Sequence, residues 1–227
     1  MVPDARNFLR ILTSTEPGPP VLFAPFVSRY LTEQLIWRRG VHLWQTPESY
    51  IDTLTSLRER TYADVVIADA RLFPDQMQVL ADCMERFSAD GIRYVALCGT
   101  PEQAAYFDTV GAVCALGMYG ALRVGKLPVI AMEHTVSQAI EAGCAGWYCR
   151  DGMIEEHWDT CHNKIAIMGG LGEDWVRSAS PAAIHKRAEE CFRHTGNARM
   201  AIGSGGMLPD DTYLSLISLL GIYRRYR

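Results

Sequence analysis

Charged and polar residues directly follow the apolar runs of this chain, and they indicate where chemistry could occur. Asp69 ends the run from Val65 to Ala68, and its carboxylate could stabilise a cationic intermediate or accept hydrogen bonds from ring N–H groups. The alternative is that Asp69 only caps the next turn of the backbone. The full set of such positions comprises Phe26, Arg29, Asp69, Arg71, Cys98, Thr100, Tyr119, Glu133, His134, Cys149, Arg150, Asp151, Gly169, Gly170 and the stretch 204–206.

Arginines at three of these positions could hold a carboxylate group of a substrate. Arg29 lies shortly after the first apolar run, and a guanidinium can bind a carboxylate through two parallel hydrogen bonds. Arg71 and Arg150 are further candidates for the same contact. For Arg29, an ion pair within the protein is the alternative interpretation. Asp69 and Arg29 are the candidate catalytic residues.

The glycine-rich stretch Gly203-Ser204-Gly205-Gly206 could bind an anion through its backbone N–H groups. The alternative is a tight turn that needs glycine because its φ angles are positive. Aromatic residues such as Tyr119 could line a pocket wall, although packing in the core is the alternative for them. Besides Arg71 and Arg150, the expected substrate-binding residues are Phe26, Tyr119, His134, Gly170, Ser204 and Gly205.

Another group of residues has side chains that bind transition metals. Cys149, His157 and Cys161 are close in sequence, and His157 and Cys161 are four residues apart, on one face of an expected helix. The paired spacings typical of zinc sites do not occur here, and buried cysteines more often pack as small apolar side chains. We therefore expect no metal. The alternative ligand set is His134, Cys149, His157 and Cys161.

Eight apolar segments, each followed by a helical pattern, must position these residues. The segments expected as strands are 21–26, 64–69, 94–98, 112–116, 127–132, 145–149, 165–168 and 200–202. Strands that are apolar on both faces are typical of a parallel sheet covered by helices. Eight such units favour a compact (β/α)8 TIM barrel of the α/β class, with polar residues at the carboxyl ends of the strands. An open doubly wound sheet is the alternative, but a Gly-rich phosphate fingerprint does not follow the first strand.

The expected helices have clear signals at their ends. For the helix 181–194, Ser180 is a suitable N-cap, Pro181 suits the first turn and Gly196 ends the helix. Thr46 and Pro47 begin a helix that runs to about residue 62. The other expected helices are 3–13, 31–39, 74–88, 101–110, 119–123, 135–142, 152–161 and 210–224.

The composition is that of an ordinary globular protein, with 227 residues, 48% hydrophobic and 21% charged. This length fits one domain over residues 1–227. The net charge of −4 argues against a nucleic-acid partner. No run approaches the roughly 20 apolar residues of a membrane span. Seven scattered cysteines favour a reducing, cytoplasmic setting, and a homodimer is an open alternative to a monomer.

The stretch from Lys164 to Asp211 is expected as a strand, a glycine pair, a helix, a second strand and Gly-Ser-Gly, followed by Pro209 and Asp211. Residues 20–31 combine an apolar strand with an arginine, and residues 63–69 form a strand with an acidic end. These segments resemble the uroporphyrinogen decarboxylase superfamily, which includes the haem-pathway decarboxylase and the zinc- and corrinoid-linked methyltransferases. The resemblance covers most of the chain and is most specific in its C-terminal part.

The resemblance implies a function. In the decarboxylases the acidic residue that ends the second strand binds the pyrrole nitrogens of the substrate, so Asp69 is expected in this role, and Arg29 is expected to hold a carboxylate. The implied reaction is the cofactor-independent decarboxylation of a carboxylated, tetrapyrrole-like substrate in the mouth of the barrel, catalysed by a carboxy-lyase. One alternative is a methyltransferase-type protein that handles a corrinoid or a small methylated compound. The other is a divergent binding protein without catalytic activity.

The sequence departs from the superfamily at several functional positions. Where the methyltransferases have a His-x-Cys zinc pair, this chain has His134-Thr135-Val136, and their third zinc ligand aligns with Gly206. The late histidine of the decarboxylases aligns near Ser204, and the first of their two loop arginines aligns with Pro25. We therefore expect no cofactor, with zinc or a corrinoid only if the methyltransferase interpretation holds.

Overall fold

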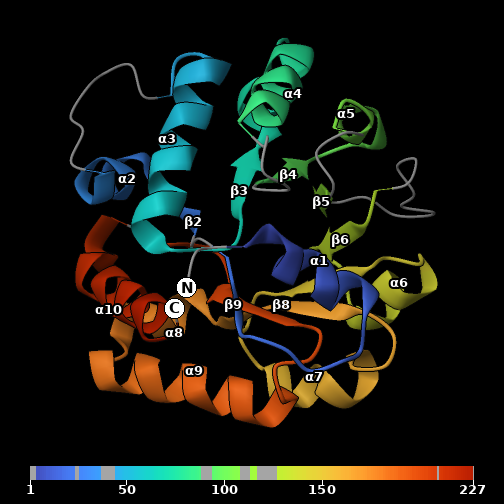
Figure 1. The fold of residues 1–227 in the computed structure, drawn as a ribbon, viewed down its shortest axis with the longest axis vertical. Coiled ribbons are helices and arrows are strands. Elements are labelled where there is room, and N and C mark those ends of the chain that lie inside the picture. The colour runs from blue at the N-terminus through green and yellow to red at the C-terminus, as the bar shows by residue number, and fades with distance from the viewer. Residues whose placement is uncertain are drawn as a thin grey trace.

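The computed structural model describes residues 4–23, 26–36, 44–87, 94–107, 113–116, 127–208 and 210–226, and it shows a parallel α/β protein (Figure 1). Within these residues, one sheet contains eight strands, and all neighbouring strands are parallel. In spatial order the strands are β1 (Val21–Leu22), β9 (Met200–Ser204), β8 (Ala166–Leu171), β7 (Gly146–Cys149), β6 (Val129–Met132), β5 (Val113–Leu116), β4 (Tyr94–Cys98) and β3 (Val66–Asp69). A separate parallel pair consists of β2 (Phe26–Val27) and β10 (Met207–Leu208).

Helices surround the sheet, and α9 and α10 pack against each other at one side of it (orange and red in Figure 1). The α-helices are α1 (Ala5–Thr13), α2 (Arg29–Ile36), α3 (Pro47–Thr61), α4 (Met77–Arg86), α5 (Pro101–Ala105), α6 (Val136–Glu141), α7 (Ile154–Cys161), α8 (Glu173–Ser178), α9 (Pro181–Thr195) and α10 (Tyr213–Arg225). Two 3₁₀ helices are η1 (Ala70–Leu72) and η2 (Asp210–Thr212). Among the described helices, none has both the length and the apolar character to cross a membrane.

The first and last strands in the sheet order are in contact through the residues beside them. Phe23, directly after β1, forms a parallel bridge with Val65, directly before β3. The backbone N–H of Asp64 donates to the carbonyl oxygen of Leu22 at 2.8 Å, and the N–H of Leu22 donates to Oδ2 of Asp64 at 3.0 Å. The other carboxylate oxygen of Asp64 accepts from the N–H of Asp4 at 3.0 Å, which ties the start of α1 to the same point.

In the part of the chain that the structure describes, buried apolar side chains form two separate clusters. The larger cluster lies between the sheet and the helices that cover it. The smaller cluster takes alternate residues from strands throughout the sheet, together with one face of α1, because successive side chains of a strand point to opposite faces. Its buried members are Phe8, Ile11, Leu12, Val21, Phe23, Val65, Ile67, Val95, Leu97, Ile130, Met132, Tyr148, Ala166, Met168 and Ala201.

Local signals at helix ends act as the sequence predicts. The hydroxyl of Ser180 accepts from the N–H of Ala183 at 3.2 Å, and α9 ends at Gly196 with a φ of 61°. Thr46 caps α3, and Pro47 is its first residue. The predicted helices and strands are largely confirmed, with ends that differ by a few residues.

Several predicted boundaries are wrong. The first strand of the main sheet ends at Leu22, and Phe26 belongs to β2 in the small second sheet. Gly169 and Gly170 do not close their strand, because β8 continues through them to Leu171 with φ angles of 126° and 93° at the two glycines. β9 likewise continues to Ser204. The elements η1 and α8 were not predicted, and the helix expected at 119–123 lies outside the described residues.

Candidate functional site

Asp69 and Arg71 form a bidentate ion pair at the carboxyl end of β3. The Asp69 carboxylate accepts from Nε of Arg71 at 2.8 Å and from Nη2 at 2.7 Å. It also accepts from the backbone N–H of Arg71 at 3.0 Å and so caps η1. The Asp69 side chain is 14% exposed and that of Arg71 is 44% exposed, so the guanidinium forms the solvent-facing side of the pair. Both interpretations of Asp69 are thus compatible with its geometry.

A second ion pair joins the ends of β6 and β7. Nη1 of Arg150 lies 3.2 Å from Oε1 of Glu133, and both side chains are about half exposed. Glu133 has a φ of 58°, a left-handed conformation that is uncommon for this residue type. The hydrogen bonds that Arg71 donates to Asp69 raise the pKa of Arg71, and the charge of Glu133 contributes to this increase. The carboxyl ends of these strands therefore carry two ion pairs, Asp69–Arg71 after β3 and Glu133–Arg150 at the ends of β6 and β7.

Two groups near Asp69, the Tyr50 hydroxyl and the Cys98 thiol, are buried and neutral. The hydroxyl of Tyr50 accepts from the N–H of Asp69 at 2.8 Å, and burial raises the pKa of this hydroxyl. Burial also raises the pKa of the Cys98 thiol to about 12, and the charge of Asp69 adds to the effect. A thiol with this pKa stays protonated at neutral pH, so Cys98 is a poor nucleophile.

The glycine-rich stretch after β9 packs closely against neighbouring segments. A Cβ atom on Gly203 would lie 2.4 Å from the ring of Phe23, and one on Gly205 would lie 2.2 Å from the carbonyl oxygen of Arg150. The N–H of Gly205 donates to the carbonyl oxygen of Leu171 at 2.6 Å, so it is not available to an anion. None of Gly203, Gly205 and Gly206 has a positive φ angle, so close packing explains these glycines better than a tight turn does. Ser204 is fully buried, and its carbonyl oxygen accepts from the Tyr148 hydroxyl at 2.6 Å.

For the remaining expected substrate-binding residues, the structure describes the backbone of some and the side chains of few. Arg29 is the first residue of α2, and Phe26 pairs with Met207 in the second sheet, so β2 lies beside β10. The side chains of Phe26 and Arg29, and all of Tyr119, lie outside the described residues. The carbonyl oxygen of His134 accepts from Nε1 of Trp147 at 2.7 Å.

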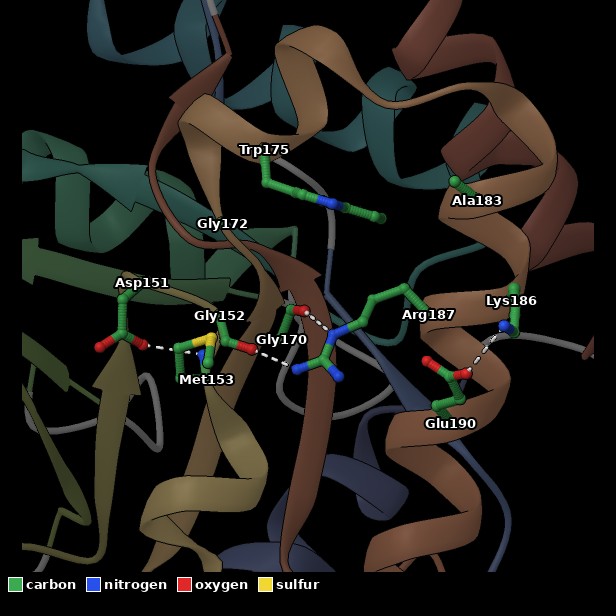
Figure 2. A pocket seen from close by; sticks show the side chains of 10 residues that line it. All are labelled: Asp151, Gly152, Met153, Gly170, Gly172, Trp175, Ala183, Lys186, Arg187 and Glu190. Atoms are coloured by element: carbon green, nitrogen blue, oxygen red, sulfur yellow. Dashed lines mark hydrogen bonds and ion pairs between the residues drawn. The ribbon is translucent and has the colours of Figure 1, made fainter.

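A cavity of about 380 Å³ lies beside the ends of β7 and β8 (Figure 2). Trp175 lies across one side of it, and Arg187 reaches into it from α9 (Figure 2). Among the predicted substrate-binding residues that the structure describes, only Gly170 lines this cavity. Its lining consists of Asp151, Gly152, Met153, Gly170, Gly172, Trp175, Ala183, Lys186, Arg187 and Glu190.

Arg187 holds the loops around this cavity together. Its guanidinium donates to both carboxylate oxygens of Glu155 at 2.5 and 2.7 Å. It also donates to the carbonyl oxygen of Gly152 at 2.6 Å and to that of Gly170 at 3.4 Å. Burial raises the pKa of the Glu155 carboxyl, but the hydrogen bonds from Arg187, a backbone hydrogen bond and the charges of Arg187 and His194 together outweigh it and lower this pKa. Sequence reasoning missed Arg187, although it lies between Ile184 and Ala188 beside the apolar stripe of α9, an unusual place for a charged residue.

Cys149, Asp151 and His157 bring a thiol, a carboxylate and an imidazole together. The Cys149 Sγ donates to Oδ1 of Asp151 at 3.0 Å, and Nε2 of His157 lies 3.5 Å from Oδ2 of the same carboxylate. Burial raises the pKa of the Cys149 thiol. Burial opposes the charge of Asp151, but bonds from Cys149 and the Met153 N–H outweigh it and lower the carboxyl pKa. This group contains two of the four alternative metal ligands, with Asp151 in place of His134 and Cys161.

Comparisons with known proteins do not identify a family for this chain. Neither the models of known protein families nor the curated proteins give a match. The resemblance to the uroporphyrinogen decarboxylase superfamily therefore stays a prediction from the sequence motifs.

Proposed function

We propose that the sheet closes into a compact (β/α)8 barrel and that the protein is a member of the uroporphyrinogen decarboxylase superfamily. The bridge between Phe23 and Val65 supports closure, because it joins the two ends of the sheet order. The ring of Phe23 also packs at 5.7 Å from that of Tyr148 on β7, which β9 and β8 separate from β1 in the sheet order. An apolar cluster with members from both ends and the middle of the sheet is the expected interior of a barrel.

The proposed activity is the cofactor-independent decarboxylation of a carboxylated, tetrapyrrole-like substrate at the carboxyl ends of the strands. The two ion pairs at these ends, Asp69–Arg71 and Glu133–Arg150, are the observation that carries this proposal. Arg71 and Arg150 offer exposed guanidinium groups to substrate carboxylates, in addition to the predicted contact of Arg29. Asp69 offers a carboxylate to ring N–H groups.

The Asp69–Arg71 pair gives this site a way to change its charge when substrate binds. Without substrate, Arg71 neutralises Asp69 through two short hydrogen bonds. A substrate carboxylate competes for Arg71 and leaves the Asp69 charge available to the ring nitrogens. Protonation of the ring then creates a cation beside Asp69, which stabilises it. The carbon–carboxylate bond breaks, CO₂ leaves, and the electron pair of that bond neutralises the protonated ring. A proton from solvent then adds to the carbon, and the ring returns its first proton to solvent.

We also assign the protein to the cytoplasm. Those cysteines whose side chains the structure describes are buried free thiols, namely Cys83, Cys98, Cys144, Cys149, Cys161 and Cys191. Reducing compartments keep cysteines in this form.

Absorbance titration with a carboxylated porphyrin tests the proposed function. We expect saturable binding that Arg71→Met weakens by about tenfold or more, because a hydrogen bond to a charged group contributes about 1.5 kcal/mol or more. Asp69→Asn should also weaken binding, because it replaces one of the two acceptor oxygens and removes the charge. The matched controls Arg60→Met and Asp82→Asn change exposed side chains on α3 and α4 and should bind as the unmodified protein does.

A parallel titration with a cobalamin separates the proposal from its alternatives. Binding of the cobalamin but not of the porphyrin would favour the methyltransferase-type protein and overturn the proposed activity. Porphyrin binding that is unchanged by both Arg71→Met and Asp69→Asn would remove the proposed site. If porphyrin binds as proposed, loss of CO₂ from a carboxylated substrate is the second measurement, and its absence would leave only a binding protein.

A further inference from the structure

We infer that Cys149, Asp151 and His157 form a binding site for one divalent transition-metal ion, with Zn²⁺ as the best match. The three side chains come from the end of β7, the loop after it and α7. Their candidate ligand atoms, Sγ, a carboxylate oxygen and an imidazole nitrogen, all lie within 4.8 Å of one another. Zinc binds this mixture of sulfur, nitrogen and oxygen ligands.

The spacing of the three side chains fits a tetrahedral ion. Zinc–ligand bonds of about 2.0–2.3 Å at tetrahedral angles place ligand atoms roughly 3.3–3.8 Å apart. The Sγ–Oδ1 distance between Cys149 and Asp151 is 3.0 Å, and the Oδ2–Nε2 distance between Asp151 and His157 is 3.5 Å. Adjustments of under about 1 Å would therefore bring three ligands onto one ion. The thiol–carboxylate and imidazole–carboxylate contacts seen here are those that an ion would replace.

The loop that carries Asp151 is fixed before any ion binds. Oδ1 of Asp151 accepts from the N–H of Met153 at 2.9 Å. Gly152 has a φ of 77°, and a Cβ atom there would lie 2.5 Å from the backbone nitrogen of Gly172. The Arg187 guanidinium holds the carbonyl oxygen of Gly152 at 2.6 Å. A preorganised turn lowers the ordering cost of binding, because little backbone freedom remains to be lost.

The surroundings of the site allow a fourth ligand. Cys149 is fully buried, whereas the Asp151 side chain is 56% exposed and that of His157 is 28% exposed. The Trp147 indole packs edge-on at 4.8 Å from the His157 ring and restrains its orientation. The protein would enclose an ion on the side of Cys149, and the coordination position that faces solvent would stay open. Three protein ligands with an open position are typical of zinc sites that bind water or a substrate.

The metal site shares no residue with the Asp69–Arg71 pair, although Arg150, a proposed carboxylate contact, lies between Cys149 and Asp151 in the sequence. Cys149 belongs to the cluster between the sheet and its helices, whereas Asp69 and Arg71 lie at the end of β3. Asp151 also lines the cavity next to Trp175, so a bound ion would lie beside that cavity and not at the Asp69–Arg71 pair. Metal binding can therefore be measured without any tetrapyrrole, and either proposal can fail alone.

Titration of chelator-treated full-length protein with Co²⁺ tests the metal site. Co²⁺ takes the place of Zn²⁺ in such sites and gives a sulfur-to-cobalt absorption band only if a thiolate is a ligand. We expect the band to saturate at one ion per chain and Zn²⁺ to displace it. Cys149→Ser should abolish the band. Loss of outer-shell partners alone lowers metal affinity by about 10–100-fold, so loss of a ligand in Asp151→Asn or His157→Gln should lower it at least this much.

Matched controls keep the result interpretable. Cys161→Ser changes another buried thiol on α7, and His162→Gln changes the histidine directly after it, so both should keep the band and the affinity. A circular dichroism spectrum shows whether each variant is folded, and the partly exposed His157 gives a variant that should fold even if Cys149→Ser does not. No saturable Co²⁺ binding, or a band that survives Cys149→Ser or is lost in Cys161→Ser, would overturn the inference.

Discussion

Asp69 and Arg71 show which site features sequence reasoning can reach at the scale of single residues. They are two residues apart at a strand end, so their meeting in an ion pair follows from local geometry. Arg187 and Glu155 are 32 residues apart, and only the packing of α9 against α7 brings them together. Asp151 was recognised as a strand-end residue, but its place between Cys149 and His157 depends on how α7 returns to the sheet.

The Arg187–Glu155 pair gives a prediction on the pH dependence of stability. Because the folded pKa of Glu155 lies below its usual value, its contribution is present above the unfolded pKa of about 4.3 and is lost as pH falls through the folded pKa. Urea denaturation at pH 7 and at acid pH should therefore show a larger loss of stability in the unmodified protein than in Glu155→Gln. Equal losses in the two proteins would contradict the assigned role of this pair.

Glutamate at a different position is the control for this measurement. Glu59→Gln changes an exposed side chain on α3 and should lose as much stability on acidification as the unmodified protein does. At pH 7, Glu155→Gln should also be the less stable variant, because it leaves the Arg187 charge without its partner in a largely buried place.

At the scale of helices and strands, local signals were predictable and non-local ones were not. Ser180 and Gly196 set the ends of α9 through bonds and backbone angles within a few residues, so the sequence predicts them. β8 extends through Gly169 and Gly170 because it pairs with β7 and β9. The β-propensities of the residues in β8 alone do not predict this pairing. The same holds for β9, which continues to Ser204 because it pairs with β8.

Close packing after β9 predicts a cost for any side chain at Gly205. A Cβ atom there would lie 2.2 Å from the carbonyl oxygen of Arg150, and backbone on a strand end cannot move aside cheaply. Gly205→Ala should therefore lower the free energy of unfolding by about 1–3 kcal/mol, measured by urea denaturation. Gly99→Ala is the matched control, since its Cβ atom would lie 3.4 Å from the Gln103 side chain, an ordinary contact. Equal denaturation midpoints for the two variants would show that Gly205 is not constrained as described.

At the scale of the whole molecule, the repeated strand–helix pattern predicts the parallel α/β class, and the structure confirms it. Continuous apolar strands require burial on both faces, and the two apolar clusters supply this. The proposed closure into a barrel is harder to predict, because it would depend on contacts between segments that are distant in the sheet order. Here Asp64 is the connecting residue, since it bonds to Leu22 on one strand and to Asp4 at the start of α1. The sequence gives no signal for its buried carboxylate beyond its place as the first residue of an expected strand.

The central claim is that the strands close around an apolar interior and present Asp69, Arg71 and Arg150 to a carboxylated ligand. A crystal structure of the protein grown with a carboxylated porphyrin tests it most directly. The account predicts continuous backbone pairing between the segments at Phe23 and Val65, and a ligand carboxylate on Arg71 or Arg150 with ring nitrogens toward Asp69. An open gap between those two segments, or a porphyrin bound away from the carboxyl ends of the strands, would contradict it.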